Sequence, residues 1–453
     1  MKKALTFLLL AALLATPLTG CDKANSDDEP AKTTTESKDN GDNIPDYNAA
    51  DANPASDFEY KVGEDGGITI TKYIGTDTDV VIPEKIDGKC ITIIKGAFAG
   101  NYSITSVKMP HTITNLGIAT FSDCILLSKV ELSASLQTIE RQCFYDCKSL
   151  FDITLPNTLT EIGMSAFTGC NNLKSIHIPK SLKIWGKEAF VGTGLESIEF
   201  EEGLEEIGEA AFSDCDKLTS VKLPDSVKVI HNEAFYNCNY LTMIELPKDL
   251  KTIGNDVFRM CPRLTSIELP EGLEEIGSNV FQLCVGLKHI TVPKTIKSFG
   301  TNSFGGSGLE TVIIAEGLQE LGKEAFGYTS LKEIVIPDSV QTIGKSAFEG
   351  CQQLESVKLG ASVQSIEKHA FLGATNLKEL VIPASVVKID SEAFLGCTNL
   401  TAIRFEGNTP DGLVADEAKD NGIYDFIPFT IYYHEGATGF TSPEWNGYKT
   451  EIW

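Results

Sequence analysis

The chain carries a pattern of apolar positions that recurs about every 23 residues. Successive members of its most regular position, a phenylalanine, are separated by 23 or 22 residues throughout. A period of this length lies in the range of leucine-rich repeats and outside that of the common helical repeats. The pattern therefore predicts a solenoid of about 14 repeats of 22–23 residues, in which each coil contacts only its neighbours. The phenylalanines are Phe98, Phe121, Phe144, Phe167, Phe190, Phe212, Phe235, Phe258, Phe281, Phe304, Phe326, Phe348, Phe371 and Phe394.

A single repeat, residues 241–263, shows what each coil is expected to contain. Ile244 and Leu246 point to one side while Met243 between them alternates to the other, which is the periodicity of a β-strand. Pro247 has no backbone N–H and cannot extend a ladder of hydrogen bonds, so the strand ends there. We expect these strands to stack in parallel about 4.8 Å apart, in a body that is mostly β-structure with little helix.

The second half of the repeat turns the chain back around the core. Ile253 returns an apolar side chain inward, Gly254 is expected to make a tight corner through a positive φ, and Phe258 fills the interior. The position five residues before each Phe is large and apolar in every copy, beginning with Ile93. The pattern therefore predicts an apolar core without interruption.

The full pattern, L-x-x-I-x-L-P-x-x-L-x-x-I-G-x-x-A-F-x-x-C over residues 77–406, resembles the BspA-type (treponemal-type) leucine-rich repeat of bacterial surface proteins. The resemblance implies a leucine-rich repeat solenoid, placed in the α/β horseshoe class, with parallel stacked strands. It also implies adhesion to host matrix proteins and contact between bacterial cells. Some copies depart from the pattern, with the proline replaced by Ser133, Glu201, Ala315, Gly360 and Glu406.

The first residues have the features of a secretory signal. Lys2 and Lys3 precede an apolar run from Ala4 to Leu18, too short to be kept as a spanning helix. Residues 18–21, Leu-Thr-Gly-Cys, resemble a bacterial lipobox, which implies a signal peptide over residues 1–20 and a lipid on Cys21. The alternative is ordinary signal cleavage near an incidental cysteine.

Residues 21–57 are expected to form a disordered tether behind that lipid. Residues 22–57 hold ten acidic residues and three lysines with almost no large apolar side chain, so they cannot bury a core. The run Ser26-Asp27-Asp28-Glu29 resembles the acidic export signal of Bacteroidetes-type lipoproteins. That resemblance implies an outer-membrane lipoprotein whose body faces outward. A merely solvated tether, and a body on the periplasmic side, are the alternatives.

The repeats are expected to be closed by a cap at each end. Residues 58–76 contain two alternating runs around Gly63–Gly67 and predict an N-terminal hairpin cap. Residues 407–453 are rich in aromatic side chains and predict a C-terminal cap, because terminal repeats of solenoids are atypical. An aromatic platform for a ligand is the alternative. The aromatic residues are Tyr424, Phe426, Phe429, Tyr432, Tyr433, Phe440, Trp445, Tyr448 and Trp453.

Charge narrows the classes of partner. The formal net charge is −25, so repulsion from phosphate argues against nucleic acid as a ligand. The same field disfavours an anionic membrane, which leaves the lipid on Cys21 as the one expected link to a membrane.

Nine of the twelve cysteines follow a repeat Phe by three residues, as a buried ladder of small side chains would. We expect mostly free, unreactive thiols, and no metal site, because the cysteines have no histidine companions. The six histidines are scattered over different coils, and the paired carboxylates form rows instead of converging. The sequence therefore predicts no catalytic residues, no cofactor and no enzyme activity.

One stretch of the predicted strand surface differs from the rest. Its outward positions are small or polar in the early coils, whereas Ile313, Val335 and Val381 form an apolar stripe, expected to be rimmed by Glu333, Lys358 and Glu379. An exposed apolar stripe with a polar rim is typical of a protein-contact site. The alternative is simple β-propensity on a strand surface.

Together these features predict a non-enzymatic binding or adhesion protein of the cell surface. The expected ligand is a host matrix protein or a bacterial surface protein. A glycan-capturing lipoprotein and an inert envelope scaffold are the alternatives.

Overall fold

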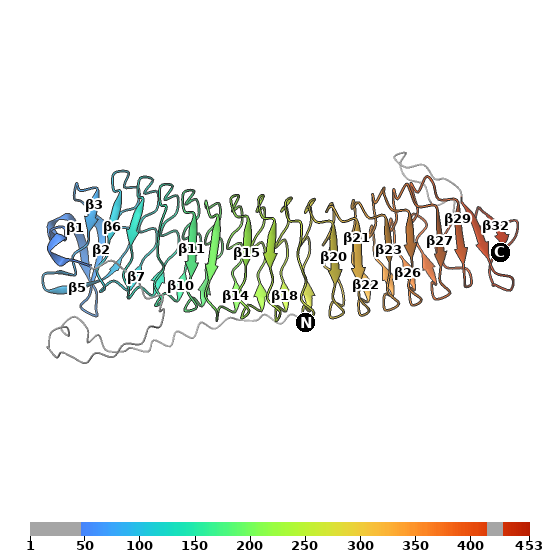
Figure 1. Ribbon diagram of the computed structural model, residues 1–453, viewed down its shortest axis with the longest axis horizontal. Helices are drawn as coiled ribbons and strands as arrows, with labels where there is room; N and C mark the ends of the chain where they lie inside the picture. The colour runs from blue at the N-terminus through green and yellow to red at the C-terminus, as the bar shows by residue number, and fades with distance from the viewer. Residues whose placement is uncertain (1–46, 415–428) are drawn as a thin grey trace, which may run out of the picture. The chain divides into compact units, whose positions relative to one another are not determined.

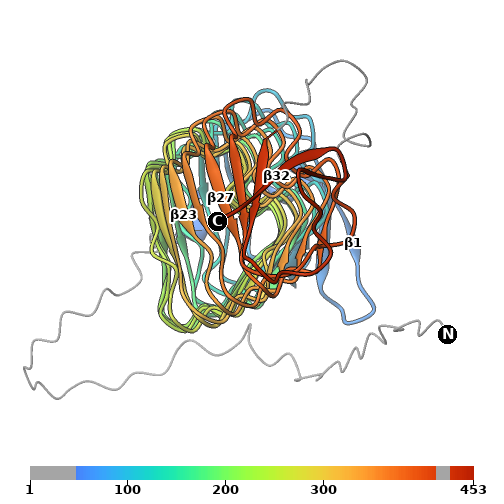
Figure 2. The same cartoon turned by 90° about the vertical axis from the view of Figure 1, so that its right-hand side faces the viewer.

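The computed structural model describes residues 47–414 and 429–453. Residues Pro45–Trp453 form one compact unit, an elongated parallel β-solenoid (Figure 1). In its described residues the helical segments are two short 3-10 turns, η1 (Ala49–Asp51) and η2 (Ala55–Asp57). Seen from the C-terminal end, the coils superpose in outline around a shared interior (Figure 2). The predicted solenoid fold with parallel stacked strands and little helix is confirmed.

Most coils contribute a front strand of three or four residues, which lies on the near face in Figure 1. The front strand has the alternation that the sequence predicts: in β17, Ile244 is buried between exposed Met243 and Glu245. The front strands are β3 (Asp79–Val81), β6 (Ser106–Lys108), β8 (Lys129–Glu131), β11 (Ser175–Ile178), β13 (Ser197–Phe200), β15 (Ser220–Lys222), β17 (Met243–Glu245), β20 (His289–Val292), β21 (Thr311–Ile314), β23 (Glu333–Val335), β25 (Ser356–Lys358), β27 (Glu379–Ile382), β29 (Ala402–Phe405), β30 (Thr430–Tyr433) and β32 (Tyr448–Ile452).

A second, shorter strand on the far face was not predicted from the sequence. It occupies two residues in most coils, and its second residue points into the core, as Ile253 does in β18. The back strands are β2 (Ile68–Tyr73), β5 (Lys89–Ile94), β7 (Asn115–Leu116), β9 (Thr138–Ile139), β10 (Glu161–Ile162), β12 (Ile184–Trp185), β14 (Glu206–Ile207), β16 (Val229–Ile230), β18 (Thr252–Ile253), β19 (Glu275–Ile276), β22 (Glu320–Leu321), β24 (Thr342–Ile343), β26 (Ser365–Ile366) and β28 (Lys388–Ile389).

The front sheet is interrupted, whereas the stack of phenylalanines is continuous. Front strands pair in short groups, such as β11 with β13 and β20 with β21, so that the ladder of hydrogen bonds stops and restarts along the body. In contrast, every repeat Phe amide from Phe98 to Phe371 donates to a carbonyl of the following coil, as Phe258 N does to Val280 O at 3.0 Å. This run of turns is an unbroken connection between the coils.

The phenylalanine rings form the centre of the core. All fourteen are buried, and neighbouring rings are stacked with centroids 4.9 to 5.9 Å apart. Each buried ring contributes on the order of 1.5 to 3 kcal/mol from its removal from water. The rings are thus slightly farther apart than the spacing of about 4.8 Å predicted between stacked strands.

The corner of each coil is made by residues other than the one expected. Gly254 does not have a positive φ, so the prediction for this glycine is wrong. The left-handed positions are two residues before and two after the Phe, at Asp256 (φ 56°) and Met260 (φ 59°) in this coil. Polar residues with short side chains tolerate this conformation better than bulky ones. Because non-glycine residues hold most of these positions, the left-handed corners could not be recognised from the sequence.

Glycines at this position of the repeat allow close packing between coils. A Cβ atom on Gly277 in the next coil would lie 2.5 Å from the carbonyl carbon of Gly254, and one on Gly300 would lie 2.4 Å from that of Gly277. Such separations are well inside van der Waals contact. The row of glycines therefore lets the backbones of successive coils approach one another at this corner.

The first coil is shifted by one residue relative to the predicted register. Ile93 was expected in the core, but Ile94 is the fully buried residue and is paired with Leu116 of the next coil, while Ile93 is paired with Asn115 and is half-buried. Trp185 is also only half-buried at the equivalent position of its coil. The core is continuous, but these two copies do not fill it as the others do.

The N-terminal end of the solenoid is covered by two segments. β1 (Phe58–Val62) pairs antiparallel with β2, and the turn between them holds Gly63–Gly67. Residues 47–57 were expected to belong to the disordered tether, yet Asn53 is buried, and its side-chain oxygen accepts a hydrogen bond from Val81 N at 2.8 Å. β3 is an edge strand, so the backbone groups on its outer side have no partner strand, and Asn53 supplies a hydrogen-bond partner for one of them.

The front sheet continues past the end of the repeat pattern. β30 pairs in parallel with β29, and β32 pairs in parallel with β30. A short strand, β31 (Glu444–Trp445), then folds back antiparallel on β32. Ring packing accompanies this end, with Phe429 stacked on Tyr448 at 4.7 Å.

Candidate binding surface

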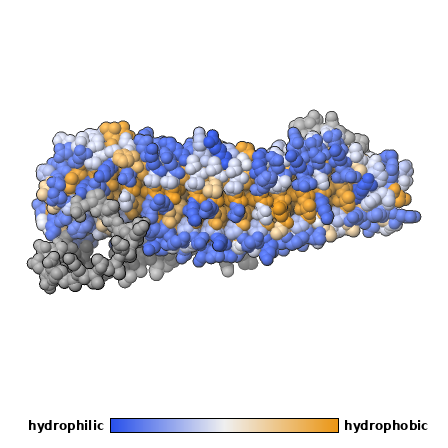
Figure 3. Space-filling view, in the orientation of Figure 1, coloured by the Kyte–Doolittle hydropathy of each residue, from blue (hydrophilic) through white to orange (hydrophobic). Residues whose placement is uncertain are grey.

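The predicted stripe residues lie on the near face of the body. Ile313 is 65% exposed, Val335 60% and Val381 41%, which is high for aliphatic side chains in strands. Glu333 and Glu379 are exposed on the strands of Val335 and Val381, and Lys358 is exposed on β25. Figure 3 shows this face with an apolar band along the middle of the body and hydrophilic residues above and below it. The stripe is therefore accessible to a partner.

The order of residues along the stripe differs from the predicted layout. Val335 is paired with Lys358 and Val381 with Arg404, so these charged residues stand in the same row as the aliphatic ones. Lys358 therefore interrupts the stripe between Val335 and Val381 instead of rimming it. We call this row the outer row; from coil to coil it contains Lys222, Glu245, Glu268, Thr291, Ile313, Val335, Lys358, Val381 and Arg404.

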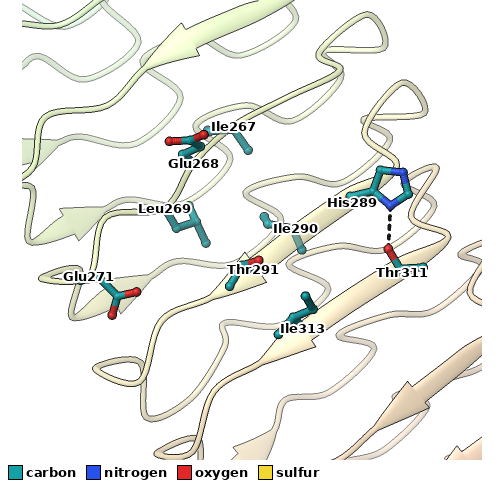
Figure 4. A pocket seen from close by; sticks show the side chains of 9 residues that line it. All are labelled: Ile267, Glu268, Leu269, Glu271, His289, Ile290, Thr291, Thr311 and Ile313. Atoms are coloured by element: carbon teal, nitrogen blue, oxygen red, sulfur yellow. Dashed lines mark hydrogen bonds between the residues drawn. The ribbon is translucent and has the colours of Figure 1, made fainter.

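Two shallow depressions adjoin the N-terminal end of the stripe. Both include Ile267 and Glu268 in a coil where the front strand is irregular, with a single bridge from Ser266 to Met243. The first, of about 370 Å³, reaches from these residues across β20 to Ile313 (Figure 4). The second, of about 420 Å³, extends in the other direction to Met243 and Glu245. Neither site was foreseen from the sequence, because an irregular strand leaves the periodic pattern unchanged.

The depressions have an apolar floor and an acidic rim. Ile267 and Ile290 are nearly buried and form the floor, whereas Glu268 and Glu271 are exposed at its edge. Of the charged residues in this lining, Glu245 is paired with Lys222 at 3.4 Å. His289 hydrogen-bonds the hydroxyl of Thr311 through Nδ1 at 2.6 Å. The surface is therefore suited to a partner that offers apolar and cationic groups.

The histidines of the described residues do not assemble a catalytic site. His177 lies between Glu199 and Glu201 on the front face, and His231 contacts Glu206 at 2.9 Å on another coil. His369 contacts Glu392 at 2.7 Å. Hydrogen bonding by Lys368 and then His369 lowers the pKa of Glu392. Each is a surface contact between one histidine and one or two carboxylates, and the three contacts lie on different coils.

The cysteine ladder is part of the core. The nine cysteines that follow a repeat Phe are buried and free, and so is Cys143 at the position before Phe144. Each of the nine donates its thiol to the carbonyl of a repeat Phe in the preceding coil, as Cys261 Sγ does to Phe235 O at 3.2 Å. Burial raises the pKa of Cys261 to about 12. Cysteine is thus a small core residue that also satisfies a carbonyl, a role beyond the apolar one predicted.

Two other kinds of feature are absent from the described ranges, 47–414 and 429–453. Within them no three His, Cys, Asp or Glu side chains are grouped so that they could hold a metal ion. No helix in these ranges has the length and apolar character needed to cross a bilayer. Cys21, the acidic run Ser26–Glu29, Tyr424 and Phe426 lie outside the described residues.

The C-terminal aromatic residues are mainly packed inside. Phe429, Tyr433, Trp445 and Tyr448 are buried, whereas Trp453 is 45% exposed. His434 stacks on Trp453 at 4.5 Å, and other contacts to its ring come from Arg404. The exposed aromatic surface at this end is therefore small.

Comparison with known proteins gives the family. The BspA type leucine rich repeat region matches in six copies, over residues 91–219, 205–330 and 319–411. The chain belongs to this family of leucine-rich repeat proteins. No curated protein sequence matches significantly.

One solved structure shows the same architecture along most of the chain, and others are similar in sequence. A leucine-rich repeat protein from Bacteroides ovatus is 25% identical with a TM-score of 0.64, over 87% of this chain and 98% of that one. A leucine-rich repeat protein from T. pallidum is 32% identical over 47% of this chain and 90% of that one, with a TM-score of 0.38. A leucine rich cell surface protein from Faecalibacterium prausnitzii is 26% identical over 79% and 95%, with a TM-score of 0.45.

Proposed function

We propose that this protein is a non-enzymatic binding protein of the cell surface, which presents its front strand face to a protein ligand. The observation that carries the proposal is the exposure of Ile313, Val335 and Val381 on one face, beside unfilled depressions and charged residues. Isolated apolar residues are common on protein surfaces. Ile313 and Val335, however, are successive in the outer row, and Ile313 also lines the first depression, which favours contact with another protein. A host matrix protein or a surface protein of another bacterium is the ligand class that we propose.

Several features support a binding role over catalysis. The surface is long and shallow, and its titratable groups are arranged in rows from coil to coil, which suits extended contact more than chemistry at one point. The described C-terminal aromatics are largely buried, so a glycan platform has less support than a protein-contact face. Binding to glycans is therefore the second candidate, and Trp453 is the residue that favours it.

We also propose that the body is held at the outer face of the outer membrane through a lipid on Cys21. The lipobox-like residues before Cys21 and the acidic run behind it support this placement. An envelope scaffold without a soluble ligand is the competing proposal, and a periplasmic body is the competing location.

The binding proposal is tested by a pair of matched double variants. Ile313→Asp with Val335→Asp adds two charges to the front face, and Ile184→Asp with Val387→Asp adds two to similarly exposed positions of back strands or their edges. We expect the front variant to lose at least tenfold in affinity for members of a panel of immobilised host matrix proteins and bacterial cells that wild type binds. Equal losses in both variants, or in neither, would refute the assignment of the front face.

The location is tested by protease treatment of intact cells. We expect the repeat body to be cleaved when the cells are intact and a Cys21→Ala form to be released or mislocalised. Protection of the wild-type body until the envelope is broken would place it in the periplasm. That result would favour the scaffold.

A further inference from the structure

The apolar band on the front face runs along the body, across the strands. A front strand has three or four residues in most coils, so a partner aligned with one strand would cover only a short part of the band. The depressions and the stripe together extend through successive coils from Met243 to Val335. An occupant that covers this surface must therefore lie parallel to the long axis of the body.

The spacing of the coils fits one kind of occupant. Across the coils that carry this surface, the stacked core rings of Phe258, Phe281, Phe304, Phe326 and Phe348 are 5.2 to 5.8 Å apart, whereas hydrogen-bonded front strands lie about 4.7 to 4.9 Å apart. An α-helix has a pitch of about 5.4 Å, which lies between these two spacings, so a helix along the axis places about one turn opposite each coil. Side chains on one face of an extended strand repeat at about 6.6 to 6.8 Å and lose register within a few coils.

Charges along the outer row indicate the character of such a helix. Glu245 and Glu268 are neighbours in this row, Thr291 follows, and Ile313 and Val335 continue it. The acidic end therefore favours basic residues on the partner, and the aliphatic part favours an apolar stripe. From Glu245 to Lys358 the row spans five coil steps, about 27 Å, which is the length of about 18 helical residues.

We propose that the front face binds an amphipathic α-helix of a partner protein, aligned with the axis of the solenoid, with its apolar stripe over Ile313 and Val335 and basic residues over Glu245 and Glu268. The inference rests on the proposed binding function and names the partner chemistry for the same surface. The floor residues Ile267 and Ile290 lie in the depression that the helix covers. Because Lys358 follows Val335 in the outer row, the apolar contact in that row covers the two coils of Ile313 and Val335, or about two helical turns.

The test uses three synthetic peptides of about 18 residues and the full-length protein. The first peptide contains leucine and lysine with the leucines on one helical face. The second has the same composition in an order without an apolar face. The third replaces lysine by glutamate in the first. Binding is measured by fluorescence anisotropy at low salt and at physiological salt.

We expect the first peptide to bind at least tenfold more tightly than the second or the third. Ile313→Asp should reduce its affinity at least tenfold and Glu268→Lys several-fold. Two control variants, Val387→Asp and Glu275→Lys, change exposed residues away from the front row and should leave the affinity unchanged. Circular dichroism of the peptide should show helix formation on binding.

Two results would overturn the inference. Equal binding of the first and second peptides would show that no helical face is recognised. Equal effects of Glu268→Lys and Glu275→Lys would show attraction to the overall negative charge and no docking at this row. If no peptide binds while the matrix panel still distinguishes the front double variant, the helix inference fails and the proposed function stands. If the matrix panel also fails to distinguish the front double variant from wild type, both the helix inference and the proposed function are refuted.

Discussion

The buried thiols should make the protein sensitive to alkaline pH. Cys238, Cys261 and Cys284 are buried in three successive coils, and burial raises the pKa of each thiol, to about 12 for Cys261. In the unfolded chain the same thiols have a pKa near 8.5. Above that value the unfolded state loses protons that the folded state retains. The free energy of unfolding therefore falls as pH rises from about 8.5 towards the folded pKa.

The size of the effect follows from proton linkage. Between pH 8 and pH 10, each such thiol lowers the free energy of unfolding by about 1.5 to 2 kcal/mol. Three thiols together account for about 5 kcal/mol. Replacement of all three by serine removes the titration but keeps a hydroxyl that can donate to the carbonyl accepting each thiol, such as Phe235 O for Cys261.

The assay is urea denaturation of wild type and the triple serine variant at pH 8, 9 and 10 in the presence of a reductant. The variant is expected to be less stable at pH 8, because a buried hydroxyl replaces a thiol, but to lose about 5 kcal/mol less than wild type by pH 10. Lysine and tyrosine titrate in both proteins and cancel in the comparison. Parallel pH dependences in the two proteins would refute the reasoning, since they would mean that these thiols ionise equally in both states.

Three further predictions concern packing and charge. Phe258→Ala should lower the free energy of unfolding by about 3 to 5 kcal/mol, measured by chemical denaturation, because a fully buried ring between two stacked neighbours is removed; an unchanged midpoint would contradict the burial. Gly277→Ala should lower the thermal stability of the protein, because the added Cβ would lie 2.5 Å from the backbone of Gly254. Gly66→Ala is the control: open space surrounds Gly66, but its φ is positive, so alanine there causes backbone strain without a clash. Thermal unfolding of both variants separates the two effects. Glu392→Gln should make the free energy of unfolding depend less on pH in the acid range. The lowered pKa of Glu392 contributes stability that is present above about pH 4.5 and lost as pH falls through the folded pKa. Identical acid denaturation curves for variant and wild type would show that Lys368 and His369 do not stabilise this carboxylate.

The solenoid could be predicted because every coil repeats the same few constraints. Phe258 and its thirteen equivalents mark the period, and the alternation around Ile244 gives the front strand directly. The back strands were not predicted, because two residues such as Thr252–Ile253 are too short to show a periodicity of their own. Their presence depends on hydrogen bonds to neighbouring coils.

The corner geometry shows another limit of the sequence. Glycine usually marks a positive φ, yet Gly254 serves close approach between coils while Asp256 and Met260 adopt the left-handed conformation. The predicted register of the first coil was also wrong. Ile93 and Ile94 are chemically alike, and only their pairing with Asn115 and Leu116 decides which one is buried.

The candidate surface was predicted in its residues but not in its form. Exposure of Ile313, Val335 and Val381 follows from strand alternation, which is local information. The depressions around Ile267 depend on an irregular strand whose sequence, Ser266-Ile267-Glu268, looks like that of its regular neighbours. The place of Lys358 within the row depends on pairing between coils.

The continuous run of hydrogen-bonded Phe turns also affects how the number of repeats in such a chain can change during evolution. Because each joint between coils repeats the same hydrogen bond and the same ring contact, loss of one 23-residue unit, such as residues 236–258, would bring the coil of Phe235 against that of Phe281 with a joint of the usual kind. Repetitive coding sequence is prone to gain and lose whole units by unequal recombination. The length of this rod can therefore vary by single coils while its two ends keep their own structure.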